Sequence, residues 1–220
     1  KIKVGIEFNG LYWHSESFKD KSYHLTKTNL MEENGYHLIH IYEDDWDNKK
    51  EIIKSRLRNL LGVTLNKVNT RKCEIRNVSY SISKDFLINN HLQGNCQSKI
   101  RIGLFYNDEL VSLMTFGNLR KNLGYSSSEN NYEMLRFCNK LDTNVPGSAS
   151  KLFNFFVINY KPKKLISYAD RSWSNKYKNL YNVLGFKLID ETKANYHYLI
   201  NRSRVNRFNY RKQKLVKMGY

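Results

Sequence analysis

The feature that most constrains the fold is a six-residue stretch near the start of the chain, 4–9, with the sequence VGIEFN. Apolar residues alternate with glycine or polar residues, which is the period of a β-strand, and Gly10 then breaks the strand. Glu7 and Asn9 therefore project from one face, with His14 just beyond the turn. A carboxylate, an amide and an imidazole at the end of a strand can hold a hydrated Mg²⁺ and orient water.

The residues that follow predict alternating helices and strands. Residues 23–34 read as a helix ended by Gly35, and 36–42 as a buried strand rich in β-favouring residues. Asp47 can cap a further helix that runs to about Leu61. The order β-α-β-α predicts an α/β fold with parallel strands, because a crossover connection returns the chain in the same direction.

Two blocks resemble the phage-type homing endonucleases related to very-short-patch repair nucleases, of the PD-(D/E)xK superfamily. They are IEFNGLYWH at 6–14 and a longer block from YHLTKT at 23 to GYHLIHIYEDDW at 35–46. The resemblance implies a restriction-endonuclease-like core that hydrolyses double-stranded DNA with Mg²⁺. It also implies a phage-encoded protein in the cytoplasm of a bacterial host. The family's other essential carboxylate lies on the preceding strand, so we expect residues upstream of Lys1 and no activity from the chain as given.

The resemblance makes Glu7 a metal ligand, but it leaves the group that activates water open. The superfamily strand reads carboxylate-x-lysine, whereas this one reads Glu7-Phe-Asn9. His14 matches a histidine of the repair nucleases and is either a general base or phosphate contact, or a structural residue. Asn9 either binds a metal-bound water or shapes the turn. Lys27 either replaces the absent lysine or is a solvated helix residue.

Two further features near this site, an aromatic pair and an acidic run, have two readings each. In the repair nucleases aromatic residues wedge into the base stack, so Tyr12 and Trp13 either contact DNA or belong to the core. Trp46 reads as core. The acidic run 43–45 either supports a second metal or caps the next helix.

Composition favours a nucleic-acid partner. The chain of 220 residues carries a net charge of +17, and nucleic acid is the commonest partner of so basic a protein. Residues 1–68 hold 11 basic and 10 acidic side chains, a net of +1, whereas residues 69–220 hold 26 and 10, a net of +16. The predicted domains are therefore 1–68 for the nuclease and 69–201 for DNA binding, with a basic tail at 202–220.

The sequence lacks two patterns, a transmembrane span and a cysteine arrangement for zinc or disulfides. No apolar run approaches the length of a transmembrane span, so no membrane partner is expected. The three cysteines, Cys73, Cys96 and Cys138, are odd in number and far apart. They fit a reducing compartment and predict neither a zinc site nor a disulfide framework.

The second domain resembles the N-acetyltransferase (GNAT) fold in the order of its expected elements. These are strands at 73–78, 100–106, 109–116, 132–138 and 164–170, helices at 84–91 (capped by Ser83), 151–160 and 177–184, and a hairpin within 187–200. The loop at 146–150 stands where that family binds the pyrophosphate of acyl-CoA, so its anion-binding residues would be Gly147, Ser148, Ala149 and Ser150. A GNAT-like scaffold that grips DNA is the preferred interpretation, and a true acyltransferase that uses acyl-CoA is the alternative.

The remaining DNA contacts are predicted in the basic segments near the C-terminus. Arg171, in the polar stretch 170–174, either binds a phosphate or nucleotide or belongs to a helix cap. The tail holds seven basic residues with Phe208 and Tyr210 between them, and its predicted phosphate contacts are Arg202, Arg204, Arg207, Arg211, Lys212 and Lys214. The sequence thus predicts a DNA endonuclease. The alternatives are a nucleic-acid-binding protein with an incomplete nuclease site and an acyl-CoA-dependent transferase that modifies nucleobases.

Overall fold

The computed structural model describes residues 3–12, 22–119, 130–192, 196–217 and 219. Contacts divide the chain into two compact units. Unit 1 joins the N-terminal residues to two C-terminal segments, namely Lys1–Asn48, Asp170–Asn182 and Phe186–Tyr220. Unit 2 holds the middle of the chain, namely Lys49–Ala169 and Val183–Gly185. This division differs from the predicted one at 68/69, because most residues beyond 169 pack with the N-terminal strands.

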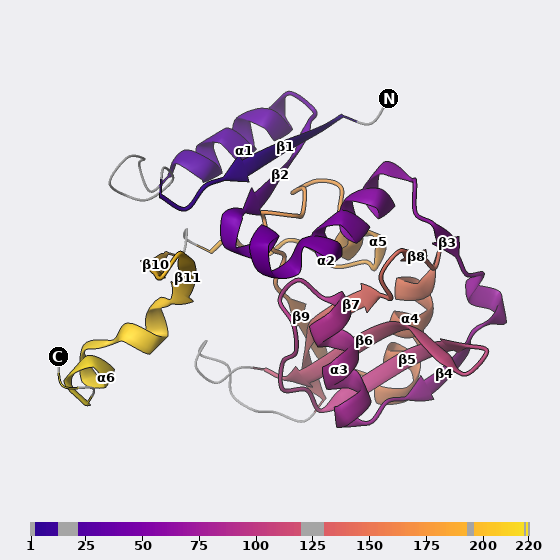
Figure 1. The fold of residues 1–220 in the computed structure, drawn as a ribbon. Coiled ribbons are helices and arrows are strands. Elements are labelled where there is room, and N and C mark those ends of the chain that lie inside the picture. The colour runs from indigo at the N-terminus through magenta and orange to yellow at the C-terminus, as the bar shows by residue number, and fades with distance from the viewer. Residues whose placement is uncertain (1–2, 13–21, 120–129, 193–195, 218, 220) are drawn as a thin grey trace. The chain divides into compact units, whose positions relative to one another are not determined.

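Unit 1 is built on the parallel strand pair that the sequence predicted. Its elements are β1 (Val4–Asn9), α1 (Tyr23–Glu33) and β2 (His37–Tyr42). β1 and β2 run parallel with Glu7 opposite His40, and α1 lies against the pair (Figure 1). The helix approaches closely at Gly5, where a Cβ would lie 3.1 Å from the Cε of Met31. The β-α-β order and the strand direction are therefore confirmed.

The two faces of β1 show the reverse of the usual burial, because the polar face is covered and the apolar face is exposed. Asn9 is fully buried and the Glu7 side chain is only 10% exposed, whereas Ile6 and Phe8 are 52% and 53% exposed. Buried polar groups cost free energy unless they are paired. The polar face of β1 is thus buried against polar partners, Lys27 and His40.

The next helix begins earlier than predicted. α2 (Glu43–Leu61) starts directly after β2 rather than at the predicted cap Asp47, and its regular helical angles are interrupted at Lys49 (φ −139°, ψ 31°). The start is favourable because acidic side chains stabilise the positive end of a helix. Its first turn contains Glu43, Asp44 and Asp45.

The C-terminal residues of unit 1 form an ordered hairpin rather than an extended tail. The elements are β10 (His197–Ile200), β11 (Ser203–Asn206), the 3₁₀ turn η3 (Arg207–Tyr210) and α6 (Lys212–Lys217). β10 and β11 are antiparallel, and Asn201 and Arg202 form their turn with φ of 49° and 56°. The predicted bounds of the hairpin, 187–200, are thus wrong, because its second strand, Ser203–Asn206, lies in residues assigned to the tail.

Unit 2 is a mixed sheet, which confirms the α/β class. The strands are β4 (Glu74–Asn77), β5 (Ile100–Tyr106), β6 (Glu109–Asn118), β7 (Asn131–Asn139) and β9 (Lys164–Ser167), in that spatial order. The first four are antiparallel and β9 is parallel to β7. The turn between β5 and β6 has positive φ at Asn107 and Asp108, as a two-residue type I′ hairpin requires. The smaller pair β3 (Asn66–Lys67) and β8 (Thr143–Asn144) is parallel.

Two long helices pack on this sheet. The helical elements are η1 (Thr70–Lys72), α3 (Tyr80–Asn90), α4 (Ser148–Tyr160) and the short α5 (Leu180–Val183). α3 buries Leu87 against Val78, Leu110 and Leu113. α4 lies on the other face (Figure 1), where Phe156 stacks on Phe116 with ring centroids 3.6 Å apart.

Some predicted bounds in unit 2 and beyond it were wrong. α3 begins after Ser79, whose hydroxyl accepts from the N–H of Ile82 at 3.3 Å, whereas the predicted cap Ser83 is buried inside the helix. α4 begins three residues before the predicted 151, and α5 covers only part of 177–184. β9 stops at Ser167 rather than at 170. Within the described ranges, every helix is too short or too polar to span a bilayer.

Candidate metal centre

Glu7 is the central residue of the polar face of β1, and its two carboxylate oxygens have different neighbours. Oε1 accepts a hydrogen bond from the Nζ of Lys27 at 2.5 Å. Oε2 lies 3.2 Å from the Nδ1 of His40 on the neighbouring strand. The carboxylate therefore joins helix α1 to strand β2 across the strand that carries it.

Lys27 lies at the carboxylate, as one of its two predicted roles requires. Its side chain is 41% exposed, and its Nζ also lies 5.9 Å from the centre of the Tyr23 ring. The hydrogen bond to Glu7 is the main cause of a raised pKa for Lys27. The side chain is therefore a fixed positive charge beside the carboxylate rather than a proton acceptor.

His40 is held by a hydrogen-bond chain that defines which ring nitrogen carries the proton. The Thr28 hydroxyl donates to the carbonyl of His24 at 2.8 Å, and its oxygen lies 2.8 Å from the Nε2 of His40. Because that hydroxyl hydrogen is already used, Nε2–H of a neutral His40 donates to Thr28. Nδ1 then carries a lone pair, which accepts from the Nδ2 of Asn9 at 3.2 Å.

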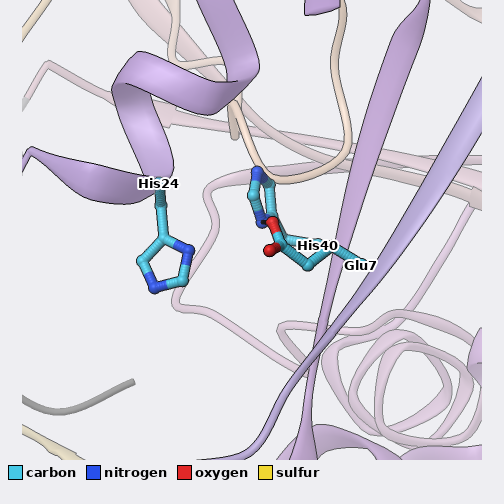
Figure 2. Close-up of side chains that lie close together, drawn as sticks. All are labelled: Glu7, His24 and His40. Carbon is cyan, nitrogen blue, oxygen red and sulfur yellow. Dashed lines mark ion pairs between the residues drawn. The ribbon is translucent and has the colours of Figure 1, made fainter. Parts of the chain in front are cut away.

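His24, in the first turn of α1, completes a group of three possible ligands. Its ring meets that of His40 edge to face, with centroids 5.4 Å apart. One ligand atom from each of Glu7, His24 and His40 lies within 4.8 Å of the other two. Figure 2 shows the carboxylate of Glu7 beside the ring of His40, with the ring of His24 near both. The three side chains come from β1, α1 and β2.

Two oxygen atoms in this cluster have unused hydrogen-bonding capacity among the described residues. They are Oε2 of Glu7 and Oδ1 of Asn9, both buried and without a hydrogen-bond donor. Oε2 faces the Nδ1 lone pair of His40 at 3.2 Å. Two electron-rich atoms at that distance repel unless a proton or a metal ion lies between them.

The structure brings together three of the predicted catalytic residues, Glu7, Asn9 and Lys27. The other, His14, lies outside the described residues, as does Trp13. Tyr12 is 61% exposed, which leaves its predicted contact with DNA as a prediction. Glu43 accepts from the N–H of Leu11 at 2.8 Å and so supports the turn after β1.

His24, His40 and Thr28 were not among the predicted site residues, although sequence signals for them exist. His24, Lys27 and Thr28 are spaced i, i+3, i+4, which places them on one helix face. His40 stands at the midpoint of β2, opposite Glu7 in the parallel register. The register is the missing information, because a shift of one residue would turn His40 to the other face of the sheet.

Two arginines predicted to bind DNA have carboxylate partners within unit 1. Arg171 donates to both carboxylate oxygens of the buried Glu32, each at 2.9 Å. Arg204 donates from Nε to Asp44 at 2.9 Å and from Nη2 to Asp45 at 2.5 Å. These ion pairs occupy several of the guanidinium donors inside the fold, and contact of Arg171 and Arg204 with DNA stays a prediction.

Two other basic residues of the predicted tail, Arg207 and Arg211, lie beside aromatic rings. The guanidinium carbon of Arg207 lies 5.1 Å from the Tyr196 ring centre, and that of Arg211 lies 4.1 Å from the Phe208 ring centre. Tyr198 meets Tyr210 edge to face at 5.7 Å. The exposed basic residues of this basic-aromatic surface are Arg202, Arg211, Lys212, Lys214 and Lys217. It keeps the composition expected of a nucleic-acid contact.

The predicted anion-binding loop in unit 2 lies at the N-terminus of α4. Gly147 has φ of 79°, a conformation that favours glycine, and it caps the helix. Ser148 and Ala149 are buried, and the Ser148 hydroxyl donates to the Oδ1 of Asn139 at 3.1 Å. Ser150 is partly exposed. The loop geometry suits an anion, but two of its four residues are already covered by the fold.

Comparisons with known proteins do not show a family for this chain. No family model matches, and no curated protein matches. An integron cassette protein from the mobile metagenome of V. cholerae shares 14% identity at a TM-score of 0.41, over 60% of this chain and 94% of that one. A ribosomal-protein-alanine N-acetyltransferase from Brucella melitensis biovar Abortus 2308 shares 13% at 0.37, over 59% and 98%. The second neighbour is an acetyltransferase. Both TM-scores are too low to establish that unit 2 has the predicted GNAT fold.

Proposed function

We propose that this chain carries the metal site of an endonuclease that hydrolyses phosphodiester bonds in double-stranded DNA, with Glu7 as its central ligand. The observation that carries the proposal is the environment of Glu7. The Glu7 carboxylate is nine-tenths buried; one oxygen is bonded to a lysine, and the other, without a donor among the described residues, faces an imidazole. No apolar role explains why a strand buries its polar face and exposes its apolar one.

Each of the neighbouring groups fits a step of phosphodiester hydrolysis. A divalent ion on Glu7 would lower the pKa of a bound water and polarise a phosphoryl oxygen. Lys27, fixed as a cation at Oε1, is placed to stabilise negative charge that develops on the phosphate. Asn9 can orient the attacking water through its buried Oδ1. The resemblance to homing endonucleases supports the same assignment for Glu7.

The proposal is tested with Glu7→Gln in the full-length protein. The amide keeps the shape of the side chain but is a poor metal ligand, so cleavage of plasmid DNA should fall by at least about 10³-fold. Affinity for DNA, measured at the same salt concentration, should change less than twofold. The matched control is Glu51→Gln, since Glu51 is exposed and pairs with Lys54. Near wild-type cleavage by Glu7→Gln would reject the proposal.

Acyl transfer by unit 2 is the second candidate, and one feature of the sheet favours it. β9 pairs with β7 over residues 131–134 of β7. Among the described strands, the second half of β7, residues 135–139, therefore pairs with β6 alone. Parallel strands that separate in this way leave backbone groups for a ligand. The helix that follows β7 begins at the Gly147 turn, where an anion would bind.

A calorimetric titration of the protein with acetyl-CoA tests this second candidate. Acyl transfer requires saturable binding that Ser150→Asp weakens at least tenfold, because a carboxylate at the start of α4 would repel the pyrophosphate. Asn159→Asp adds the same charge at the far end of the helix and should leave the affinity unchanged. Absence of binding by the parent protein at millimolar acetyl-CoA would remove acyl transfer from consideration.

A further inference from the structure

We propose that Glu7, His24 and His40 bind a transition-metal ion of the Zn²⁺ or Mn²⁺ class in preference to Mg²⁺. The inference rests on the proposed function and names the ion at the same site. The family resemblance alone led to Mg²⁺, an ion that prefers oxygen ligands and retains most of its water. Two imidazoles and one carboxylate form a different donor set, one that suits zinc, manganese, iron or cobalt.

His40 is prepared for metal binding by its own supporting residue. Metal-bound histidines usually donate the second ring N–H to an oxygen atom, which orients the ring and raises the basicity of the ligand nitrogen. Thr28 accepts from Nε2 at 2.8 Å in this way, while its hydroxyl hydrogen is used by the carbonyl of His24. Nδ1, which accepts from the Nδ2 of Asn9 at 3.2 Å, is therefore the nitrogen that a metal would bind in place of that hydrogen bond, and it lies 3.2 Å from the Oε2 of Glu7.

The spacing of the donors is close to what a small divalent ion needs. With metal–nitrogen bonds of about 2.1 Å, ligand atoms lie roughly 3 to 3.5 Å apart. The Glu7–His40 pair already has that spacing at 3.2 Å. His24 completes the set within 4.8 Å, so its ring must move inward by up to roughly 1.5 Å, which its partly exposed position at the start of α1 allows.

The buried oxygen atoms provide independent support for a cation at this position. Oε2 of Glu7 and Oδ1 of Asn9 have no donor among the described residues, and Asn9 is fully buried. A cation would satisfy Oε2 directly. A flip of the Asn9 amide would turn Oδ1 toward the ion or its bound water. Three protein ligands leave positions open for water and substrate, as in catalytic rather than structural sites.

Lys27 sets a limit on affinity that can also be measured. Its ammonium holds Oε1 at 2.5 Å, close enough to repel a cation on the same carboxylate. Lys27→Met removes that charge and keeps the length of the side chain. We expect it to bind the ion more tightly than the parent protein by at least threefold, whereas loss of a merely structural lysine would not tighten binding.

The experiment is calorimetric titration of the full-length, EDTA-treated protein with Zn²⁺, Mn²⁺ and Mg²⁺, with Co²⁺ absorption as the spectroscopic readout. One equivalent of Zn²⁺ should bind with micromolar or tighter affinity and resist displacement by millimolar Mg²⁺. His24→Ala, which removes a partly exposed ligand, should weaken Zn²⁺ binding at least tenfold and change the Co²⁺ spectrum. Thr28→Val, which leaves the ligands in place, should weaken it by about 10- to 100-fold. His197→Ala, in β10, is the control and should have no effect.

Binding and cleavage give separate outcomes. Zn²⁺ affinity that is unchanged by both His24→Ala and Glu7→Gln, or a Mg²⁺ affinity equal to that for Zn²⁺, would overturn the metal assignment. If cleavage then proceeds with Mg²⁺ and depends on Glu7, the nuclease proposal stands without it. Tight binding at the three residues with no cleavage under any of the ions would support the site and reject the nuclease.

Discussion

At the scale of single residues, Glu7 combines two roles that usually fall to separate side chains. Its Oε1 accepts a hydrogen bond from the ammonium group of Lys27, and its Oε2 faces the Nδ1 of His40. Asn9 and Thr28 hold that imidazole from opposite ring nitrogens. The lysine at this carboxylate, Lys27, comes from the helix packed against the strand.

Under the proposed nuclease function, Lys27→Ala should reduce DNA cleavage by about 10²- to 10³-fold, because it removes a preorganised positive charge beside the Glu7 carboxylate. Lys27→Arg should recover part of the rate, since it restores the charge with a different geometry. The measurement is single-turnover cleavage at saturating metal ion. Lys54→Ala serves as the control, because Lys54 also pairs with a glutamate but lies in the exposed pair with Glu51. Equal rates for the two alanine variants would show that Lys27 has no role in the chemistry.

At the scale of secondary-structure elements, the start of α2 and the β10–β11 hairpin are joined by a charge cluster. The Arg204 guanidinium bonds Asp44 and Asp45 and lies 3.8 Å from the Tyr42 ring centre. Burial alone would raise the pKa of Asp44, but the hydrogen bonds from Arg204 outweigh it and hold that pKa below its ordinary value. Arg204 thus attaches the hairpin to the rest of unit 1, because its guanidinium both stacks on Tyr42 and forms ion pairs with Asp44 and Asp45.

Arg204→Ala should lower the free energy of unfolding by about 2 to 3 kcal/mol at pH 7, because it leaves largely buried carboxylates without their partner. The loss should depend on pH in a defined direction. A carboxyl group with a depressed folded-state pKa contributes stability above its unfolded pKa of about 3.9 and loses it as the pH falls through the folded value. The gap between parent and variant should therefore be full at pH 7 and shrink below about pH 4.

Urea unfolding at pH 7, 5 and 3 measures this gap. Lys212→Ala, which removes an exposed charge from α6, is the control and should leave the midpoint unchanged at each pH. A gap between parent and Arg204→Ala that stays constant from pH 7 to pH 3 would mean that the ion pair with Asp44 is not its source.

At the scale of the whole molecule, the positive charge is shared between the units. By sequence, the segments of unit 1 hold 17 basic and 12 acidic side chains, a net of +5, and those of unit 2 hold 20 and 8, a net of +12. The predicted concentration of charge in residues 69–220 is therefore divided by the fold, because the basic-aromatic surface belongs to unit 1. A fragment of residues 69–220 would separate that surface from its supporting strands.

The basic-aromatic surface should contribute to the salt dependence of DNA binding by the full-length protein. Each phosphate that it neutralises adds about −0.9 to the slope of log affinity against log salt. The triple variant Arg202→Gln, Arg211→Gln, Lys212→Gln should therefore flatten the slope by up to about 2.7 and weaken binding to all sequences equally. The control set, Lys54→Gln, Lys99→Gln, Lys164→Gln, removes the same charge from unit 2. Equal effects of the two sets would mean that binding is not localised to this surface.

Much of the local structure could be predicted because it depends on short-range patterns. Alternation over six residues identified β1, Gly35 ended α1 with a φ of 77°, and Asn107-Asp108 formed the expected hairpin turn. The errors concern places where two local signals compete. Asp47 is a good helix cap, but the acidic first turn at Glu43 extended α2 to the end of β2, and Ser79 capped α3 in place of Ser83.

The sequence by itself determined the parallel β-α-β order, the pairing of a carboxylate and an amide on one face of β1, and an excess of positive charge. Only the tertiary structure decided which side chains meet that face. His24 and His40 join Glu7 through the strand register, and Arg204 finds Asp44 across 160 residues of sequence. Such contacts depend on the free energy of the whole fold, in which the burial of a charge is repaid by a partner that no local pattern specifies.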